Sequence, residues 1–382
     1  SDLSIEDCVD AVDVETICIL VGMMLLVAVI KNSGIFEYIA IKAAKIAKGR
    51  PWPIMVIFIL ITAVCSGMLD NVTTVLLVGP MTLAITNILK VDPVPYIITQ
   101  IMASNIGGTA TLIGDPPNIM IGSAAKLSFV DFILNTGVAT VFVIIVGLIC
   151  MYFIYGRKLF VTDESIAKVM QLDENKAIKD RKLMHESVIV IILVALCFIF
   201  HDQLGVQSCT VAIAAACIML LIGGQEPEEI IADVEWPTIL FFIGLFIVVG
   251  GMKKVGVITM LANGLISITH GNMVVTMMVI LWVSAIVSSF LDNIPFVATL
   301  IPMILTMQSE GMDVAPIWWA LSLGACLGGN GTLIGASANV VLSGISKNNG
   351  HPITFGQYFK IGFPMMILSI IVCSVFLLIR FA

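Results

Sequence analysis

The sequence has very little charge: Asp, Glu, Lys and Arg make up 12% of its 382 residues, whereas water-soluble domains carry about a quarter. The formal net charge is only −7 and no basic run occurs, which excludes a nucleic-acid-binding protein. The nine cysteines have no CxxC or paired spacing, which excludes a disulfide scaffold. The sequence also lacks a phosphate-binding glycine loop, so any ATP hydrolysis would need a separate subunit.

What the sequence has in excess is hydrophobic side chains, at 59% of residues and a mean hydropathy of +1.08. A straight helix needs about 20 apolar residues to cross the hydrocarbon core of a membrane. We therefore predict an all-α polytopic membrane protein. The stretches of spanning length are 16–34, 132–156, 187–202 with 205–223, 238–256 and 360–381.

Four further apolar stretches are interrupted in the middle. Residues 51–90 and 272–309 each break at a polar tip that contains Leu-Asp-Asn, and residues 95–125 and 314–346 each break at a glycine-rich run. Broken backbone at membrane depth is tolerated only where protein buries it or a water-filled cavity faces it. We therefore predict two re-entrant helical hairpins and two interrupted helices that enclose a central site.

These interruptions occur twice at nearly one offset. Asp70 lies 222 residues before Asp292, and Asn118 lies 221 residues before Asn339. Two spans precede the second copy but none precedes the first, so we expect further upstream spans in the full protein; an asymmetric chain is the alternative. The predicted organisation is a first repeat at 1–156, a cytoplasmic linker at 157–186 and a second repeat at 187–382.

The positively charged residues predict the orientation of the chain. If the stretch that ends near residue 34 ends in the cytoplasm, only Lys126, Lys253, Lys254 and Arg380 of the 19 lysines and arginines fall outside. The first hairpin then enters from the cytoplasm and the second from the opposite side, so the structural repeats are inverted. The C-terminus is predicted to lie outside the cytoplasm, and the amphipathic stretch 35–48 to lie at the cytoplasmic membrane surface.

Three acids lie deep within apolar stretches, where a charged side chain costs about 2.5 to 3.5 kcal/mol. One interpretation makes Asp70 and Asp292 ion or proton partners, and the other makes them caps of the second hairpin arms. Asp115 precedes two prolines at the expected start of a half-helix, whereas its counterpart Ala336 has no acid. Asp115 is therefore interpreted either as a proton or cation site or as a simple cap.

Neutral oxygens and glycines surround these acids. Such groups suit a hard cation such as sodium, while the starts of the half-helices attract anions. The thiols of Cys65 and Cys326 either approach the same cavity, where they would ligate arsenic, or are packing residues. The candidate ion- or substrate-binding residues are Asp70, Asn71, Thr73, Thr74, Asn105, Gly107, Gly108, Thr109, Asp115, Asn118, Asp292, Asn293, Gly329, Asn330, Thr332 and Asn339, with sodium expected at Asn71, Asn105, Asn293 and Asn330.

Three runs resemble the ion transporter superfamily, and within it the branch of arsenite permeases and the melanosomal P protein. They are SGMLDNVTTVLLVGP from Ser66 to Pro80, NIGGTATLIGDPPN from Asn105 to Asn118, and SSFLDNIPFVATLIP from Ser288 to Pro302. Sodium/proton antiporters and sodium-dicarboxylate carriers are relatives. The resemblance implies a homodimer in a prokaryotic plasma membrane, in which a transport domain moves against a scaffold. The Leu-Asp-Asn tips replace the Ser-Asn-Thr tips of the dicarboxylate carriers, which argues against carboxylate transport.

We therefore predict a secondary active transporter that moves arsenite or another small anion by an elevator mechanism. A proton or sodium gradient would drive it, and no other cofactor is expected. The alternatives are a sodium/proton antiporter and an ion channel. An enzyme is not expected, because Asp70 and Asp292 occupy matching hairpin tips and have no acid–base partner. The expected partners are membrane lipid, a second copy of the chain and, if arsenite is pumped, an ATPase subunit.

Overall fold

The computed structural model describes residues 4–269 and 271–382, and all the regular structure in these residues is helical. Eight of the described helical segments are long and apolar enough to cross a membrane. They are Val14–Lys31, Pro51–Leu69, Asn71–Leu89, Phe129–Lys158, Arg181–Phe200, Trp236–Lys254, Met273–Phe290 and Phe355–Phe381. The prediction of an all-helical polytopic membrane protein is confirmed.

The first half of the chain contains α1 (Ile5–Ala11), α2 (Val14–Lys31), α3 (Ile35–Ile46), α4 (Pro51–Leu69), α5 (Asn71–Leu89), α6 (Val94–Thr109), α7 (Pro116–Ala125), α8 (Phe129–Phe132), a π-helical turn (Ile133–Gly137) and α9 (Val138–Ile154). The polar linker carries α10 (Asp163–Met170) between two short 3-10 turns, Gly156–Lys158 and Glu174–Ala177. The amphipathic stretch expected at 35–48 is the helix α3.

The second half begins with α11 (Arg181–Leu204), α12 (Ser208–Ile222) and α13 (Pro227–Ala232). It then repeats the order of the first half with α14 (Trp236–Lys254), α15 (Val257–Thr269), α16 (Met273–Phe290), α17 (Asn293–Ser309), α18 (Ala315–Gly328), a 3-10 turn (Gly329–Gly331), α19 (Ser337–Asn348) and α20 (Phe355–Phe381). The four expected interruptions therefore fall between α4 and α5, α6 and α7, α16 and α17, and α18 and α19.

Local sequence explains why several helices begin where they do. Side-chain oxygens of Asp13, Asn272 and Thr354 accept the backbone N–H groups of Thr16, Val275 and Gln357 at 3.2, 3.0 and 3.2 Å. These caps satisfy N–H groups that have no partner within the helix. Proline occupies the first turn of α4, α6, α7, α14 and α18, where the missing N–H costs nothing.

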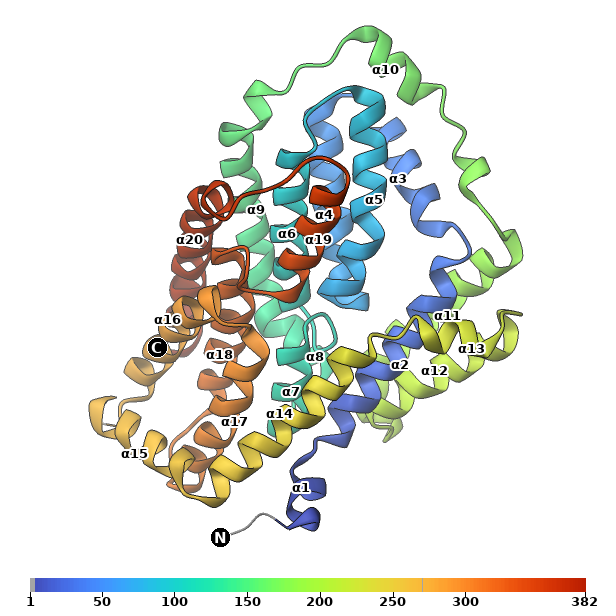
Figure 1. Cartoon of the computed structure of the whole chain (residues 1–382). Coiled ribbons are helices and arrows are strands. Elements are labelled where there is room, and N and C mark those ends of the chain that lie inside the picture. Colours follow the sequence, from blue (N-terminus) through green and yellow to red (C-terminus); the bar gives the residue numbers. More distant parts are fainter. Residues whose placement is uncertain (1–3, 270) are drawn as a thin grey trace.

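The broken helices of the two halves pack crosswise. In the first half α4 lies against α5 and α6, and in the second half α16 lies against α17 and α18. The second pieces of the broken helices cross over, because α7 packs on α17 while α19 packs on α5 and α6 (Figure 1). All four breaks are thereby brought to the middle of the molecule.

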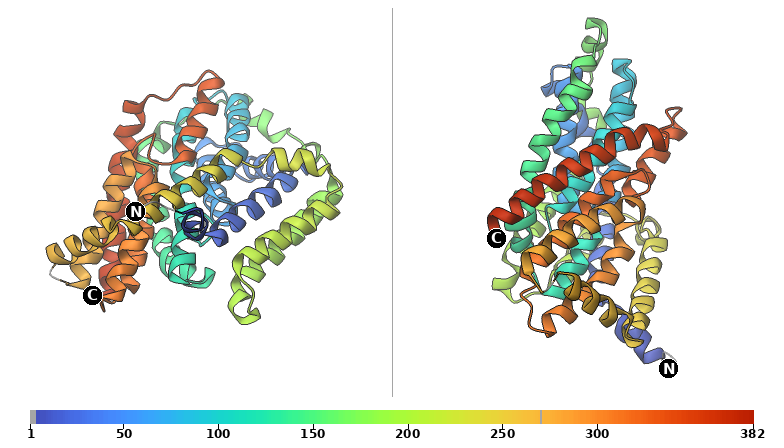
Figure 2. Two further views of the ribbon diagram at one scale, coloured as in Figure 1. Left: turned by 60° about the horizontal axis from the view of Figure 1, so that its bottom comes forward. Right: turned by 90° about the vertical axis from the view of Figure 1, so that its left-hand side faces the viewer.

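A second group of helices flanks this centre. α2 packs closely on α12 and also contacts α14 and α11. The linker helix α10 lies at one end of the molecule and α1 with α15 at the other (Figures 1 and 2). We call these the linker end and the α1 end. The linker returns to the rest of the chain at Ser33, whose carbonyl accepts the Lys179 N–H at 3.0 Å.

Two glycines allow close helix contacts at matching positions of the two halves. A Cβ atom on Gly107 would lie 2.1 Å from the carbonyl oxygen of Ala63, and one on Gly328 would lie 2.6 Å from that of Ala285. Only glycine lets α6 approach α4, and α18 approach α16, to this distance. The contacts occupy matching positions of the two halves and fix each broken helix against a hairpin arm.

Candidate functional site

The hairpin tips are held by their aspartates. The Asp70 carboxylate accepts both the backbone N–H and the hydroxyl of Thr73, at 2.8 and 2.6 Å, and so caps α5. Asp292 accepts the Ile294 N–H at 3.0 Å and the Ser337 hydroxyl at 3.0 Å, which joins the second tip to the start of α19. Both aspartates therefore act as caps, as one of the two interpretations expected.

The two tips differ in their backbone. A single residue, Asp70, connects α4 to α5 with φ of +121°, a region that residues other than glycine rarely occupy. The second tip uses two residues, Leu291 and Asp292, with ordinary backbone angles. Strain is thus confined to the first tip, where the local cost is about 1 to 3 kcal/mol.

Asp115 does not act as a helix cap. It stands at the start of α7, but its side chain makes no capping hydrogen bond. Instead both carboxylate oxygens lie 3.3 Å from the Asn293 Nδ2 of the second tip. The simple-cap interpretation of Asp115 is therefore wrong: the two prolines that follow it already remove N–H donors from the first turn, so a cap has little to bind. The carboxylate is 1% exposed.

Four asparagines form the framework between the breaks. Asn105 Nδ2 donates to Asn330 Oδ1 at 2.9 Å and to Asn339 Oδ1 at 2.8 Å, which links the two halves. Asn339 Nδ2 donates to the carbonyls of Gly329 and Thr332 at 2.7 and 2.9 Å. These bonds satisfy backbone groups that the helix breaks leave open.

Asn118 does the same in the first half. Its Nδ2 lies 3.3, 3.2 and 2.9 Å from the carbonyls of Gly108, Thr109 and Thr111. Its Oδ1 accepts the Ser322 hydroxyl at 2.6 Å from α18. The predicted residues Asn105, Asn330 and Asn339 are thus bonded to one another, whereas Asn118 is bonded to backbone and to Ser322.

Hydroxyl groups that the sequence-based list omits tie each break to a hairpin. Thr111 donates to the Gly67 carbonyl at 2.5 Å, and its counterpart Thr332, which was on the list, donates to the Ser289 carbonyl. Ser66 and Ser288 donate to the carbonyls of Ser104 and Ala325, each at 2.6 Å. The internal repeat was the signal that would have found them, because each residue occurs at the repeat offset.

A small cavity of about 30 Å³ lies between the two tips, and we call it the central cavity. Four of the predicted residues line it, namely Asp70, Asn71, Asp115 and Asn293. The other lining residues are Leu20, Met24, Val72, Pro116, Glu235, Thr238, Ile294 and Ser337. A volume of this size holds a single water or a bare ion, since one water needs about 10 to 15 Å³ by this measure.

Glu235 and Thr238 of the central cavity were missed by sequence reasoning. They stand at the start of α14, at the edge of an apolar stretch, where an acid is ordinary and attracts no attention. Thr238 donates its hydroxyl to Glu235 at 3.2 Å. No local pattern could have found them, because only the packing of α14 beside α2 and α17 brings them to the site.

Asn71 has an unused acceptor. Its Nδ2 donates to Asn105 Oδ1 at 3.4 Å, but its Oδ1 is a buried atom without a hydrogen-bond partner in the described part of the chain. The buried hydroxyl of Thr74 on the same helix also has no partner there. A buried acceptor that lacks a donor costs about 1 to 3 kcal/mol, so Asn71 is prepared for a water, a ligand donor or a cation.

The remaining candidates lie around the cavity rather than on it. Thr73 is bound to Asp70, and Thr109 donates to the Asn105 carbonyl at 2.7 Å. Gly107 serves the contact between α4 and α6 described above. Neither Cys65 nor Cys326 is among the described residues that line the central cavity, and the Cys326 thiol lies 3.5 Å from Asn118 Oδ1. Across the described residues no group of three or more His, Cys, Asp or Glu side chains is placed to hold a metal ion.

The chain is similar to several curated proteins. It is 42% identical to an uncharacterized transporter of Mycobacterium bovis over 97% of this chain and 87% of that protein. It is 32% identical to the human P protein over 98% of this chain and 54% of that protein. The fold resembles the crystal structure of the YdaH transporter of Alcanivorax borkumensis, with a TM-score of 0.67, 15% identity, and coverage of 97% of this chain and 86% of that one.

These relatives agree with the three sequence runs that resemble the ion transporter superfamily and its P protein branch, and that prediction is confirmed. The chain is a transporter and not an enzyme. The family model described as CitMHS, citrate transporter, matches residues 1–324, and the chain therefore belongs to this family of secondary transporters.

Proposed function

We propose that this transporter carries a small carboxylate or oxyanion together with a cation, and that citrate is the first substrate to test. The family description supports citrate over arsenite, although the Leu-Asp-Asn tips had argued against carboxylates. The coupling cation is a proton or sodium. Transport proceeds by alternating access across a bacterial plasma membrane.

The observation that carries this proposal is the unequal start of the two half-helices at the central cavity. α7 starts with Asp115 and two prolines, which supply a negative charge and no N–H donors. α19 starts at Ser337 without a side-chain cap, and Ser337 lines the cavity. An uncapped helix start attracts anions, and Asp292 binds the Ser337 hydroxyl rather than the backbone N–H groups of α19, so one side of the site suits a cation and the other an anion.

Electrostatic repulsion makes the binding of the anion depend on the binding of the cation. Two like unit charges about 4 Å apart repel by about 4 kcal/mol at the effective dielectric constant of a protein. An anion beside ionised Asp70 and Asp115 therefore needs a cation or a proton in the site at the same time. Coupling follows from the composition of the cavity. Since its present volume is about 30 Å³, the tips must separate before an organic anion can enter.

We further propose that the helix pair α4 and α5 and the helix pair α16 and α17 are re-entrant hairpins of inverted repeats. Asp70, the residue at the tip between α4 and α5, is buried, which suits a hairpin that turns back within the membrane. α4 to α7 and α16 to α19 would form the moving domain, and α2, α11, α12 and α14 part of a scaffold that also holds the homodimer. The domain boundaries 1–156, 157–186 and 187–382 follow from this arrangement.

A sodium/proton antiporter is the second candidate. Three carboxylates, Asp70, Asp115 and Glu235, are among the described residues that line the central cavity, and Lys, Arg and His are not. A cavity with this lining attracts cations without help from an anion.

Purified protein in sealed vesicles separates these functions. We expect radiolabelled citrate to accumulate under an imposed proton or sodium gradient and Asp115→Asn to lower the uptake by at least about tenfold. Sodium-driven proton movement without citrate, read with a pH dye inside the vesicles, would favour the antiporter. Gradient-driven arsenite uptake without citrate uptake would replace citrate as the substrate.

A further inference from the structure

A row of three cavities leads from the central cavity to the linker end. A second cavity of about 70 Å³ shares Met24 and Glu235 with the central cavity. A third, an open crevice of about 380 Å³, shares Lys31, Leu76 and Leu77 with the second. The cavities widen outward and share wall residues, so they lie in line between the site and this end of the molecule.

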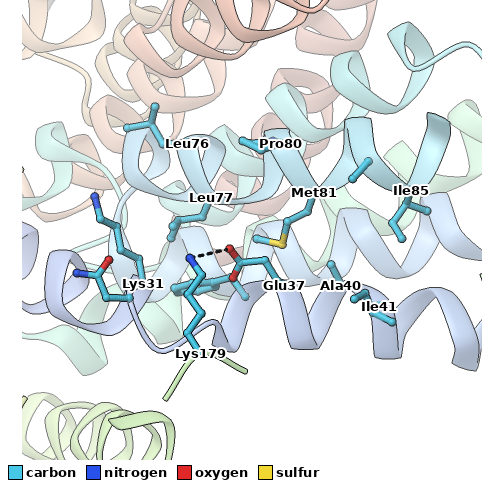
Figure 3. Close-up of a pocket in the computed structure, with 13 residues that line it drawn as sticks. Lys31, Glu37, Ala40, Ile41, Leu76, Leu77, Pro80, Met81, Ile85 and Lys179 are labelled. Atoms are coloured by element: carbon cyan, nitrogen blue, oxygen red, sulfur yellow. Dashed lines mark ion pairs between the residues drawn. The ribbon is translucent and has the colours of Figure 1, made fainter. Parts of the chain in front are cut away.

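One face of α5 forms a wall along the whole route. Val72 lines the central cavity, Thr73 and Leu76 line the second, and Leu76, Pro80 and Ile85 line the crevice. From Val72 through Leu76 and Pro80 to Ile85 the intervals are four, four and five residues, which keeps these positions on one side of the helix. Figure 3 shows α5 above α3 across the crevice, with Lys179 and Glu37 paired beside it at 3.9 Å.

Glu235 is the residue at the junction. It lines both the central and the second cavity and is half-buried. The charged groups around it are Asp70 at the first tip, Asp115 at the start of α7, and Lys31 of α2 with Asp233 in the second cavity. Lys31 and Asp233 are paired at 2.7 Å, so their charges cancel and Glu235 is the net charge of the second cavity.

The size and lining of the central cavity suit a bound water. It has room for one, and the Asn71 Oδ1, on a side chain that is 3% exposed, receives no hydrogen bond from the residues that the structure describes. A water there would donate to Asn71 and lie in the same small cavity as Asp115 and Glu235. Chains of Asp, Glu and His side chains form the proton relays of pumps and transporters.

We propose that Glu235 carries the coupling proton between the central site and the linker end. The O–H bond of the Asp115 carboxylic acid breaks as the cavity water takes its proton, and that water passes one of its own protons to the Glu235 carboxylate. Glu235 then gives the proton to water in the second cavity, and no electron changes place. This proposal rests on the proposed coupled transport. It identifies the coupling cation as a proton, because each step passes a single proton to a single acceptor, either a water or a carboxylate.

The test separates proton release from substrate binding. Vesicles that contain the full chain are assayed for exchange of labelled citrate at equal pH on both sides, and for uptake driven by a pH gradient. We expect Glu235→Gln to lower gradient-driven uptake by about 100-fold. The same variant should lower citrate exchange by no more than about tenfold. Glu235→Asp should restore most of the driven uptake, because it keeps the carboxylate. Glu228→Gln, at an exposed position on α13, is the matched control.

Several results would overturn the assignment. Equal loss of exchange and driven uptake in Glu235→Gln would show a structural role, and so would failure of Glu235→Asp to restore driven uptake. Wild-type uptake that follows a sodium gradient and ignores pH would exclude the proton. If citrate is not exchanged at all, the substrate proposal fails separately; an internal pH dye then shows whether arsenite or sodium moves protons, and that solute is used for both assays. If neither moves protons, the relay is wrong.

Discussion

At the scale of single residues, the two tip aspartates have unequal surroundings despite their matching positions. Asp70 is 6% exposed and lines the central cavity, whereas Asp292 is half-buried, binds Ser337 and is absent from the described lining. A charge in the cavity interacts with whatever ion enters it. A charge beside the cavity mainly holds structure, so the two residues are not interchangeable.

We therefore predict unequal effects of the same substitution at the two tips. Asp70→Asn should keep the cap on α5, because asparagine caps helices as well as aspartate does, and should lower gradient-driven uptake by at least about tenfold. Asp292→Asn should lower it by less than about threefold. Initial uptake rates at equal protein in the vesicles measure both. Equal loss at the two tips would contradict this distinction.

A second residue-scale prediction concerns the bond between a break and a hairpin. Thr111→Val removes the hydroxyl that donates to Gly67 and accepts the Gly114 N–H at 3.1 Å. Both partners are buried, so the loss should cost about 1 to 3 kcal/mol. Thermal unfolding in detergent should show a lower midpoint. Thr306→Val, whose hydroxyl donates only to the Pro302 carbonyl of its own helix at 2.9 Å, is the control and should change little.

At the scale of helices, the contact between α4 and α6 tolerates no side chain at Gly107. Gly107→Ala places a carbon where the Ala63 carbonyl already lies, and overpacking of this kind costs about 1 to 3 kcal/mol or more. We expect reduced yield of folded protein and a lower unfolding midpoint. Gly147→Ala on α9, where no described atom beyond the backbone of its own helix and the adjacent residues lies within 4 Å of the added carbon, should instead be neutral or stabilising by up to about 1 kcal/mol. A stable Gly107→Ala protein would show that α6 can shift away.

The linker is fastened to α3 by an ion pair that depends on pH. Lys45 Nζ lies 2.6 Å from Glu174, and this hydrogen bond lowers the pKa of Glu174 below its ordinary value of 4.5. The pair therefore stabilises the docked linker fully above that value, and the contribution is lost as the pH falls through the lower folded-state pKa.

We predict that acid releases the linker. Amide hydrogen exchange in residues 157–180, corrected for its intrinsic pH dependence, should speed up below about pH 4 in the wild type. In Glu174→Gln the exchange should be faster at neutral pH and should respond less to acid. Identical profiles for the two proteins would show that the ion pair does not hold the linker.

At the scale of the whole molecule, the central cavity meets its two flanking helices at different heights. On α2 it contacts Leu20 and Met24, near the middle, but next to α14 it contacts Glu235 and Thr238, at the very start. If the halves are inverted copies offset by 222 residues, the opposite conformation exchanges these contacts. The cavity would then lie at Asp13 and Thr16 of the first copy and at Phe242 and Phe246 of the second. A change of seven to eight residues along a helix is a movement of about 11 Å.

Cross-linking measures this movement. With the nine native cysteines replaced, we expect Val72→Cys to pair with Met24→Cys in the present conformation and with Thr16→Cys in the opposite one. A pH gradient should lower the cross-linking yield of one cysteine pair and raise that of the other. Failure of the second pair under all conditions would argue against an exchange of conformations of this size.

The sequence predicted the parts of this architecture that depend on local chemistry. Polar tips within apolar runs marked the breaks, because uncompensated backbone is costly in lipid, and the repeat marked Asp70, Asn71 and Asn293 as candidates. It could not show that Asp115 turns toward Asn293, which lies 178 residues away, or that Glu235 reaches the same cavity. Such contacts depend on how distant helices pack against one another, and a local sequence pattern does not determine this packing.

The crosswise packing has a consequence for how the protein is made. The Asn105 side chain finds its acceptor on Asn339 only after the ribosome has added 234 more residues. Until then the nascent first half carries an unpaired Asn105 amide in the bilayer, with neither α17 to cover α7 nor α19 to cover α5 and α6. Synthesis of the first half alone should therefore leave a species that membrane quality-control proteases destroy, and co-expression of the missing half should rescue it.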